Sequence, residues 1–211
     1  YLNDGDLCEG TDSRVDNFAD LPSPYLMGLM DKFFDDPHLG PIIETTRGCP
    51  YGCTFCVDSH ATRSKIKRRT PEFIAEELEY IASRMTSKNP LTMADLNFGM
   101  FKNDIDTAHV LASVIKKYDW PGTIIVAHGK AHPERVFEAV EIINQHKPGV
   151  LAFGGSLQST DPEVLGDIKR KNLSPEKMLS MVKKKLGKGE SATLFNELIL
   201  GLPRDTKVKH F

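Results

Sequence analysis

Short apolar runs alternate with longer stretches of helical periodicity through most of the chain. Runs rich in β-branched and apolar residues predict strands at 41–46, 91–98, 122–127, 149–153 and 193–200. Apolar residues spaced three and four positions apart predict helices at 70–85, 105–118, 133–145, 162–169 and 174–185. Thr70 and Pro71 are suited to begin the first of these helices, as N-cap and first-turn residue. Strand and helix alternate five times, which indicates an α/β fold built from parallel βα units.

The handedness of such units determines the expected architecture. Crossovers between parallel strands are right-handed, so the sheet curls in one direction and forms a barrel or a partial barrel. A complete eightfold barrel needs roughly 250 residues, whereas the chain has 211. We therefore expect a partial TIM-like barrel of parallel strands that is truncated after the fifth strand.

Residues 1–40 differ in character from the rest of the chain. They are rich in Asp, Gly and Pro and show weak periodicity, apart from a short helix expected from Tyr25 to Phe34. The prolines in 21–24 favour an extended or turn conformation. We expect this region to be a lead-in or linker, and residues 41–211 to form one domain. Because the first residue is Tyr1 rather than Met, we expect the sequence to be an excerpt of a longer chain.

Composition narrows the class of protein. The chain is 40% hydrophobic and 27% charged with a net charge of −2, which is typical of globular proteins and does not indicate a nucleic-acid partner. No apolar run approaches the roughly 20 residues needed to cross a bilayer, so no membrane partner is expected. Four cysteines are too few for a disulfide framework, and we expect a reducing, cytoplasmic location.

Three of the cysteines lie in one loop after the first predicted strand. Cys49, Cys53 and Cys56 have the spacing C-x3-C-x2-C. Thiolates bind zinc or iron–sulfur clusters, but closed structural zinc sites and electron-transfer clusters normally use four protein ligands. Three cysteines therefore favour a 4Fe–4S cluster with one iron left open for chemistry. The carboxyl end of a barrel strand is also where barrel enzymes place their active sites.

Two other interpretations of the cysteines stay open at this point. His60 or Cys8 could complete a zinc site, which would make the chain a non-catalytic, zinc-stabilised interaction domain. Cys8 could instead supply the fourth thiolate of an electron-transfer cluster, or be an incidental thiol.

The loop, with Phe55 placed between its last two cysteines, resembles the cluster loop of radical S-adenosylmethionine (radical SAM) enzymes. Segments 21–25, 97–102, 157–159 and 201–203 also resemble the branch of that family that often carries an N-terminal cobalamin-binding domain. The resemblance covers about residues 20 to 206. The cobalamin signature D-x-H-x-x-G itself is not matched, since the stretch 36–40 is one residue short of it and is better read as a turn.

The resemblance implies a six-stranded partial (β/α)6 barrel and a defined chemistry. The cluster, held by Cys49, Cys53 and Cys56, would reductively cleave S-adenosyl-L-methionine to a 5′-deoxyadenosyl radical that abstracts hydrogen from an unknown small-molecule substrate. Cobalamin-dependent methyl transfer, with cobalamin held by a domain outside this sequence, is one such use. The implied electron donor is a protein such as flavodoxin or ferredoxin.

The resemblance also assigns positions to S-adenosylmethionine. The implied cofactor-binding residues are Phe55, Asn97, Gln158, Ser159, Ile199 and Gly201. Phe55, Ile199 and Gly201 would lie near adenine, and Gln158 and Ser159 near ribose or carboxylate. Asp95 and Asn97 end the second strand where many members carry a Gly-Gly-Glu type motif, which is absent here. Arg204 replaces a glycine common in related sequences, and we expect it to alter that turn because Arg adopts a positive φ less readily than Gly.

Further polar residues are candidates on chemical grounds alone. The basic run 63–69 could bind a phosphate or a carboxylate and favour a reduced cluster, or be a solvated loop. His128 and Lys130 end the third strand and are candidate substrate contacts. Glu197 lies among apolar residues and would either point into the barrel or pair with a Lys or Arg. Met93, Met100 and Met178 are predicted to pack in the core.

Overall fold

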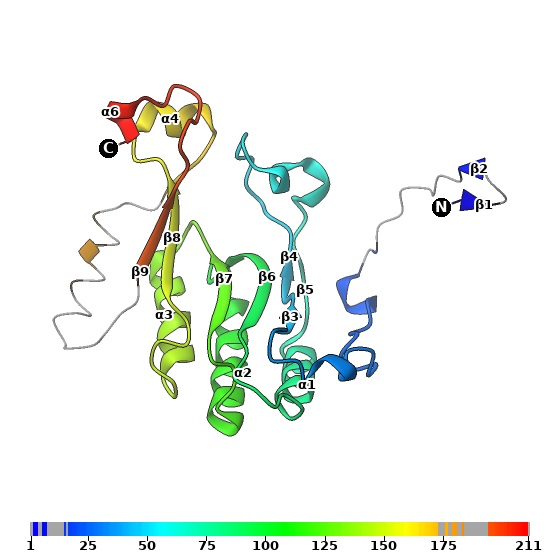
Figure 1. Ribbon diagram of the computed structural model, residues 1–211. Coiled ribbons are helices and arrows are strands. Elements are labelled where there is room, and N and C mark those ends of the chain that lie inside the picture. Colours follow the sequence, from blue (N-terminus) through cyan, green and yellow to red (C-terminus); the bar gives the residue numbers. More distant parts are fainter. Residues whose placement is uncertain are drawn as a thin grey trace.

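The computed structural model describes residues 2–3, 6–7, 15, 17–172, 176, 179–180, 183 and 194–210. The predicted βα alternation is confirmed over this part of the chain (Figure 1). The main strands are β3 (Ile42–Ile43), β6 (Leu91–Phe98), β7 (Ile124–His128), β8 (Phe153–Gln158) and β9 (Leu194–Leu198). The main helices are α1 (Pro71–Ala82), α2 (Asn103–Tyr118), α3 (Pro133–Asn144), α4 (Pro162–Asp167) and α6 (Lys207–His210).

All pairings among the main strands are parallel. The strands β3, β6 and β7 form one sheet, and β8 pairs with β9. A single parallel bridge between Ile124 and Leu151 joins β7 to the segment that leads into β8. The result is a mixed α/β fold with parallel strands in the order β3, β6, β7, β8, β9.

Shorter elements lie outside this sheet. The antiparallel pairs are β1 (Leu2–Asn3) with β2 (Asp6–Leu7), and β4 (Thr46–Arg47) with β5 (Lys67–Arg68). The described residues also form the 3-10 turns η1 (Phe18–Asp20), η2 (Asp31–Phe33), η3 (Val57–Ser59) and η4 (Ala61–Arg63). Figure 1 shows the segment between β4 and β5 rising above one end of the sheet, where it carries the cysteine loop.

The two faces of the sheet have different surroundings. Along β6, Leu91, Met93 and Asp95 are buried, whereas Thr92 and Leu96 are half-buried and Ala94 is exposed. The buried face lies against α1, α2 and α3 (Figure 1), and the core between these layers contains Leu78, Ile81, Leu111, Val136 and Ile143. The opposite face is open, which is the side that a curled sheet would enclose.

Three sequence predictions need correction. The strand expected at 41–46 is broken into β3 and β4, because Asp95 binds the backbone of Thr45 and Thr46 and draws it away from the ladder. The strand expected at 149–153 contributes one bridge, and pairing begins only at Phe153. The helix expected from Tyr25 to Phe34 is a series of turns that ends in η2, since Gly28 has φ 71° and cannot continue a right-handed helix.

The predicted helix cap and two of the predicted buried methionines are confirmed, and other predictions fall outside the described residues. Thr70 caps α1 as expected, with its hydroxyl accepting from the N–H of Phe73 at 3.2 Å. Met93 and Met100 are buried, as predicted. Cys8, Met178 and most of the helix expected at 174–185 lie outside the described residues. Among the described helices, none is both long and apolar enough to cross a membrane.

Candidate active site

The cysteine loop leaves β4 at the carboxyl edge of the sheet. Cys49 and Cys53 are buried, at 4% and 2% exposure, and Cys56 is half-buried. All three are free thiols. The Cys49 N–H donates to the carbonyl of Arg63 at 2.9 Å, and the Thr54 N–H donates to the carbonyl of Ile168 at 3.1 Å. The loop is therefore held on one side by the segment before β5 and on the other by the end of α4.

Asp95 fixes the chain just before the loop. Its carboxylate accepts from the N–H of Thr45 at 2.8 Å, from the hydroxyl of Thr45 at 2.5 Å and from the N–H of Thr46 at 3.0 Å. Burial raises the pKa of Asp95 to about 7, while the donors from Thr45 and Thr46 oppose that rise. Asp95 acts here as a positioning residue, because its hydrogen bonds go to the backbone that delivers the cysteines.

Arg170 connects the thiols to the far side of the site. This buried arginine follows α4 and lies within electrostatic range of Cys53, Cys56 and Cys49. Burial lowers the pKa of Arg170, and the three thiolates oppose that lowering. The positive charge of Arg170 near the three thiols would stabilise a negatively charged group bound there.

Asn172 holds Arg170 in place. The Nε of Arg170 donates to the Oδ1 of Asn172 at 2.8 Å. The Nδ2 of Asn172 in turn donates to the carbonyls of Leu157 at 2.7 Å and Ser159 at 2.8 Å. The end of β8 is thereby linked through Asn172 and Arg170 to the cysteine loop. Sequence reasoning missed Arg170, because one arginine between Lys169 and Lys171 carries no local signal.

Four of the predicted cofactor residues are buried or half-buried at this edge. Asn97 is 4% exposed, and neither its Oδ1 nor its Nδ2 has a partner among the described residues. Gln158 and Ser159 are buried at the end of β8, where Gln158 has φ 65°. Ile199 is half-buried, and its N–H donates to the carbonyl of Gln158 at 2.9 Å.

The other predicted positions are more exposed. Phe55 is 36% exposed, and Gly201 is exposed with φ 79°. Arg204, which we expected to alter its turn, adopts a positive φ of 59° itself. An ion pair of 2.9 Å between its Nε and the Oδ2 of Asp167 accompanies this conformation.

His128 is buried and Glu197 is not. The His128 ring lies 6.3 Å from the ring of Phe153 and 6.5 Å from that of Phe195. Neither of its nitrogens has a partner within the part of the chain that the structure describes, and burial lowers its pKa to about 4. Glu197 is exposed and accepts from the Ser156 hydroxyl at 2.7 Å, and no described Lys or Arg forms an ion pair with it.

The charged residue after His128 reaches the cysteine loop. The Nζ of Lys130 lies 5.3 Å from the centre of the Tyr51 ring, within the loop. Burial and the charges of Cys49 and Cys53 raise the pKa of Tyr51. Lys130, after β7, and Arg170, after α4, therefore bring positive charge to the cysteine loop from two different βα units.

The donor set fits an iron–sulfur cluster better than zinc. His60 is exposed, and its Nδ1 lies 2.9 Å from the hydroxyl of Thr62. In the described ranges, no three Cys, His, Asp or Glu side chains lie close enough together to hold a metal ion as they stand. The thiols instead share Arg170, and the unpartnered amide of Asn97 lies at the same edge. Such buried, unpaired polar atoms suit a polar cofactor bound beside a cluster.

Comparison with known proteins decides the family. The model of the radical SAM superfamily matches residues 43–207. This chain belongs to the radical SAM superfamily. The enzymes of this family use a 4Fe–4S cluster and S-adenosylmethionine.

Curated relatives narrow the branch. The chain is 32% identical over 206 residues to the cobalamin-dependent radical SAM methyltransferase TokK of Streptomyces tokunonensis, which covers 92% of this chain and 28% of the relative. It is 34% identical over 200 residues to a 2-(S-pantetheinyl)-carbapenam-3-carboxylate methyltransferase of Streptantibioticus cattleyicolor, with the same coverage of 92% and 28%. The chain thus spans less than a third of the length of these radical SAM relatives.

Solved structures support the fold. The radical SAM methyltransferase TsrM from Kitasatospora setae aligns with a TM-score of 0.61 at 16% identity, over 80% of this chain and 32% of TsrM. The cobalamin-dependent radical enzyme OxsB aligns with a TM-score of 0.59 at 19% identity, over 95% of this chain and 29% of OxsB. At these identities the likeness concerns the fold alone.

Proposed function

We propose that this chain is the core of a cobalamin-dependent radical SAM methyltransferase that acts on a small molecule. The observation that carries the proposal is the placement of three free thiols in one loop, within electrostatic range of Arg170, at the carboxyl edge of a parallel sheet. Two methyltransferase relatives that each cover 92% of the chain support the choice of methyl transfer. A zinc-stabilised interaction domain has no comparable support.

Each residue of the site has a proposed task. Cys49, Cys53 and Cys56 would hold the 4Fe–4S cluster, which together with S-adenosylmethionine supplies a 5′-deoxyadenosyl radical when bound. Arg170 offsets the negative charge that three thiolates bring into a buried site. Asp95 holds the backbone of Thr45 and Thr46 in place just before the cysteine loop.

The cofactor-binding assignments are part of the same proposal. Asn97, Gln158 and Ser159 offer polar groups at the strand ends that suit the methionyl and ribose parts of S-adenosylmethionine. Phe55, Ile199 and Gly201 would lie beside its adenine. Lys130 would contribute charge at the mouth of the site rather than bind the cofactor.

The wider architecture is also proposed. The open, parallel sheet suits a six-stranded partial barrel, of which residues 41–211 supply five strands and residues 1–40 the lead-in. Cobalamin would be held by another domain of the protein. A small electron-transfer protein such as flavodoxin or ferredoxin would reduce the cluster.

Cluster assembly tests the first half of the proposal. Anaerobically reconstituted protein should contain one 4Fe–4S cluster, and Cys49→Ala, Cys53→Ala and Cys56→Ala should each lose it. Cys8→Ser is the matched control and should retain iron and sulfide. With dithionite and S-adenosylmethionine, the loaded protein should release 5′-deoxyadenosine. Stoichiometric zinc without iron or sulfide would show that the proposal is wrong.

Methyl transfer is tested separately. With cobalamin and S-adenosylmethionine labelled in its methyl group, the label should appear in a small-molecule product and should depend on added cobalamin. Release of 5′-deoxyadenosine without cobalamin-dependent transfer of label would leave the radical SAM assignment standing and remove the methyl-transfer assignment.

A further inference from the structure

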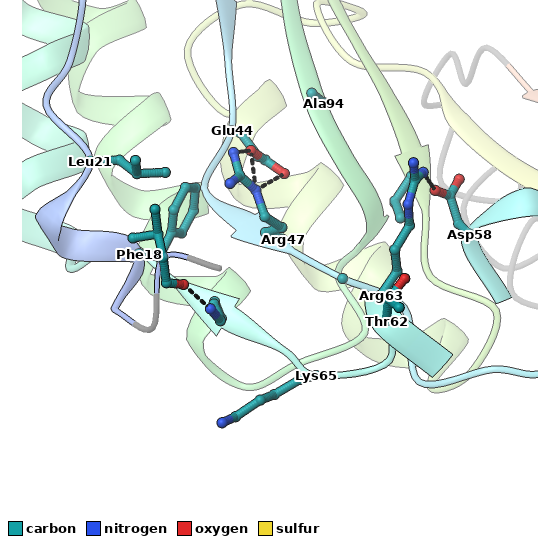
Figure 2. Close-up of a pocket in the computed structure, with 13 residues that line it drawn as sticks. Phe18, Leu21, Glu44, Arg47, Asp58, Thr62, Arg63, Lys65 and Ala94 are labelled. Carbon is teal, nitrogen blue, oxygen red and sulfur yellow. Dashed lines mark hydrogen bonds and ion pairs between the residues drawn. The ribbon is translucent and has the colours of Figure 1, made fainter. Parts of the chain in front are cut away.

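A pocket lies next to the cysteine loop, on the open face of the sheet (Figure 2). Its volume of about 590 Å³ falls within the range of small-molecule sites in proteins. Gly48, directly before Cys49, forms part of its lining, and Ala94 and Leu96 of β6 form another part. The pocket therefore joins the open face of the sheet to the chain that carries the first thiol.

One wall of the pocket is apolar and firmly held. Phe18 and Leu21 of the lead-in face Ala94 across the pocket (Figure 2). Phe18 is 3% exposed, and two guanidinium groups contact its ring, that of Arg47 at 4.5 Å and that of Arg69 at 4.3 Å from the ring centre. These contacts fix the ring and the Arg47 side chain together.

The charged part of the lining has an excess of positive charge. Among the residues that the structure describes, Arg47, Arg63, Lys65 and Lys67 are balanced by Glu44 and Asp58 alone. Glu44 pairs with Arg47 at 2.5 Å, and Asp58 pairs with Arg63 at 2.5 Å (Figure 2). Both carboxylates are thus already engaged, and four cations less two anions leave a surplus of two positive charges.

The surplus is carried by the two lysines. The ammonium of Lys67 donates to the carbonyl of Val15, a neutral partner, and no described carboxylate forms an ion pair with it. Lys65 is exposed and forms no ion pair with any residue that the structure describes. Its backbone is nevertheless fixed, because its carbonyl oxygen lies against Gly48, only 2.6 Å from where a Cβ on that glycine would lie.

We propose that this pocket binds the anionic group, a carboxylate or a phosphate monoester, of a small-molecule substrate whose apolar part lies on the wall formed by Phe18, Leu21 and Leu96. Lys65 and Lys67 supply the charge, and Arg63 offers the guanidinium N–H groups that Asp58 does not use. The inference rests on the proposed function, since it names the class of substrate for that site. The position beside Gly48 places the bound molecule near the thiols.

Three probes of equal chain length test the pocket. Calorimetric titrations of the cluster-loaded protein would use hexanoate, hexyl phosphate and the neutral hexanamide. At least one anion should bind about tenfold or more tightly than hexanamide, and its affinity should fall as salt is added. Preference for hexanoate assigns the site to carboxylates, and preference for hexyl phosphate assigns it to phosphate monoesters.

Variants connect the binding to the pocket. Lys65→Gln and Lys67→Gln should each weaken the preferred anion about tenfold. Lys116→Gln changes an exposed lysine on α2, far along the chain from the pocket, and should have no effect. Equal binding of all three probes, or unchanged affinity in both pocket variants, overturns the inference.

Iron content measured on the same samples separates the two proposals. If the wild-type protein contains a full cluster but shows no anion preference, the anion-binding proposal is wrong and the proposed function is unaffected. If the wild-type protein assembles no cluster, the proposed function itself is wrong.

Discussion

Gly48→Ala is the substitution for which the structure predicts the clearest effect on the site. Gly48 has φ 103°, a conformation that a side chain disfavours by about 1–2 kcal/mol. A Cβ at this position would lie 2.6 Å from the carbonyl oxygen of Lys65 and 2.9 Å from that of Arg63. Both are backbone atoms, so they cannot be avoided by rotation of a side chain.

The second contact reaches the cluster loop directly. The Arg63 carbonyl accepts from the Cys49 N–H at 2.9 Å, and it must move to admit the new methyl group. Overpacking of this kind costs about 1–3 kcal/mol. Together with the backbone term, we expect Gly48→Ala to lower the free energy of unfolding by about 2–5 kcal/mol and to reduce cluster retention.

Gly52 offers a matched control inside the same loop. A Cβ at Gly52 would meet no described atom within 4 Å, and its φ is not in the positive region. Gly52→Ala should therefore leave stability within about 0.5 kcal/mol and iron content unchanged. Urea titrations of the metal-free proteins and iron and sulfide assays of the reconstituted proteins measure both effects. If the two variants behave alike, the contacts of Gly48 do not hold the loop as we describe.

Two further predictions concern buried charge. Arg170→Leu removes a positive charge beside the thiols, so reduction of the cluster becomes harder. Its midpoint potential should fall by roughly 60 mV, which is a tenfold change in the equilibrium constant of a one-electron couple. Redox titration followed by electron paramagnetic resonance measures the potential, and Arg170→Lys should recover most of the loss. His128 has its pKa lowered to about 4 by burial, so its folded form resists protonation and its stabilising effect, present above about pH 6.5, is lost as the pH falls toward 4. Asp95, whose pKa burial raises to about 7, changes stability in the opposite direction over the same window, so the His128 effect is measured as a difference between two metal-free proteins. Between pH 6.5 and pH 4, urea titrations should show the wild type losing about 3 kcal/mol more free energy of unfolding than His128→Phe; equal changes in the two proteins would contradict the assignment.

The sequence by itself determined the order of the strands and helices and identified the cysteine loop as a cluster-binding loop. Both depend on local properties: the periodicity of apolar residues distinguishes strand from helix, and C-x3-C-x2-C places three thiols in one short loop. The cap formed by Thr70 was predictable for the same reason, because its partner Phe73 lies within the next turn.

Tertiary structure decided everything that depends on distant partners. Asp95 divides a strand that the apolar pattern of 41–46 presents as continuous, because a buried carboxylate has to find donors and takes them from Thr45 and Thr46. Arg170 reaches the thiols from the end of the fourth βα unit. The role of Arg170 follows from its burial and from its distance to the thiols, which no local sequence pattern shows. Lys65 is likewise placed beside the pocket by the tertiary fold, with a charge that no described residue neutralises.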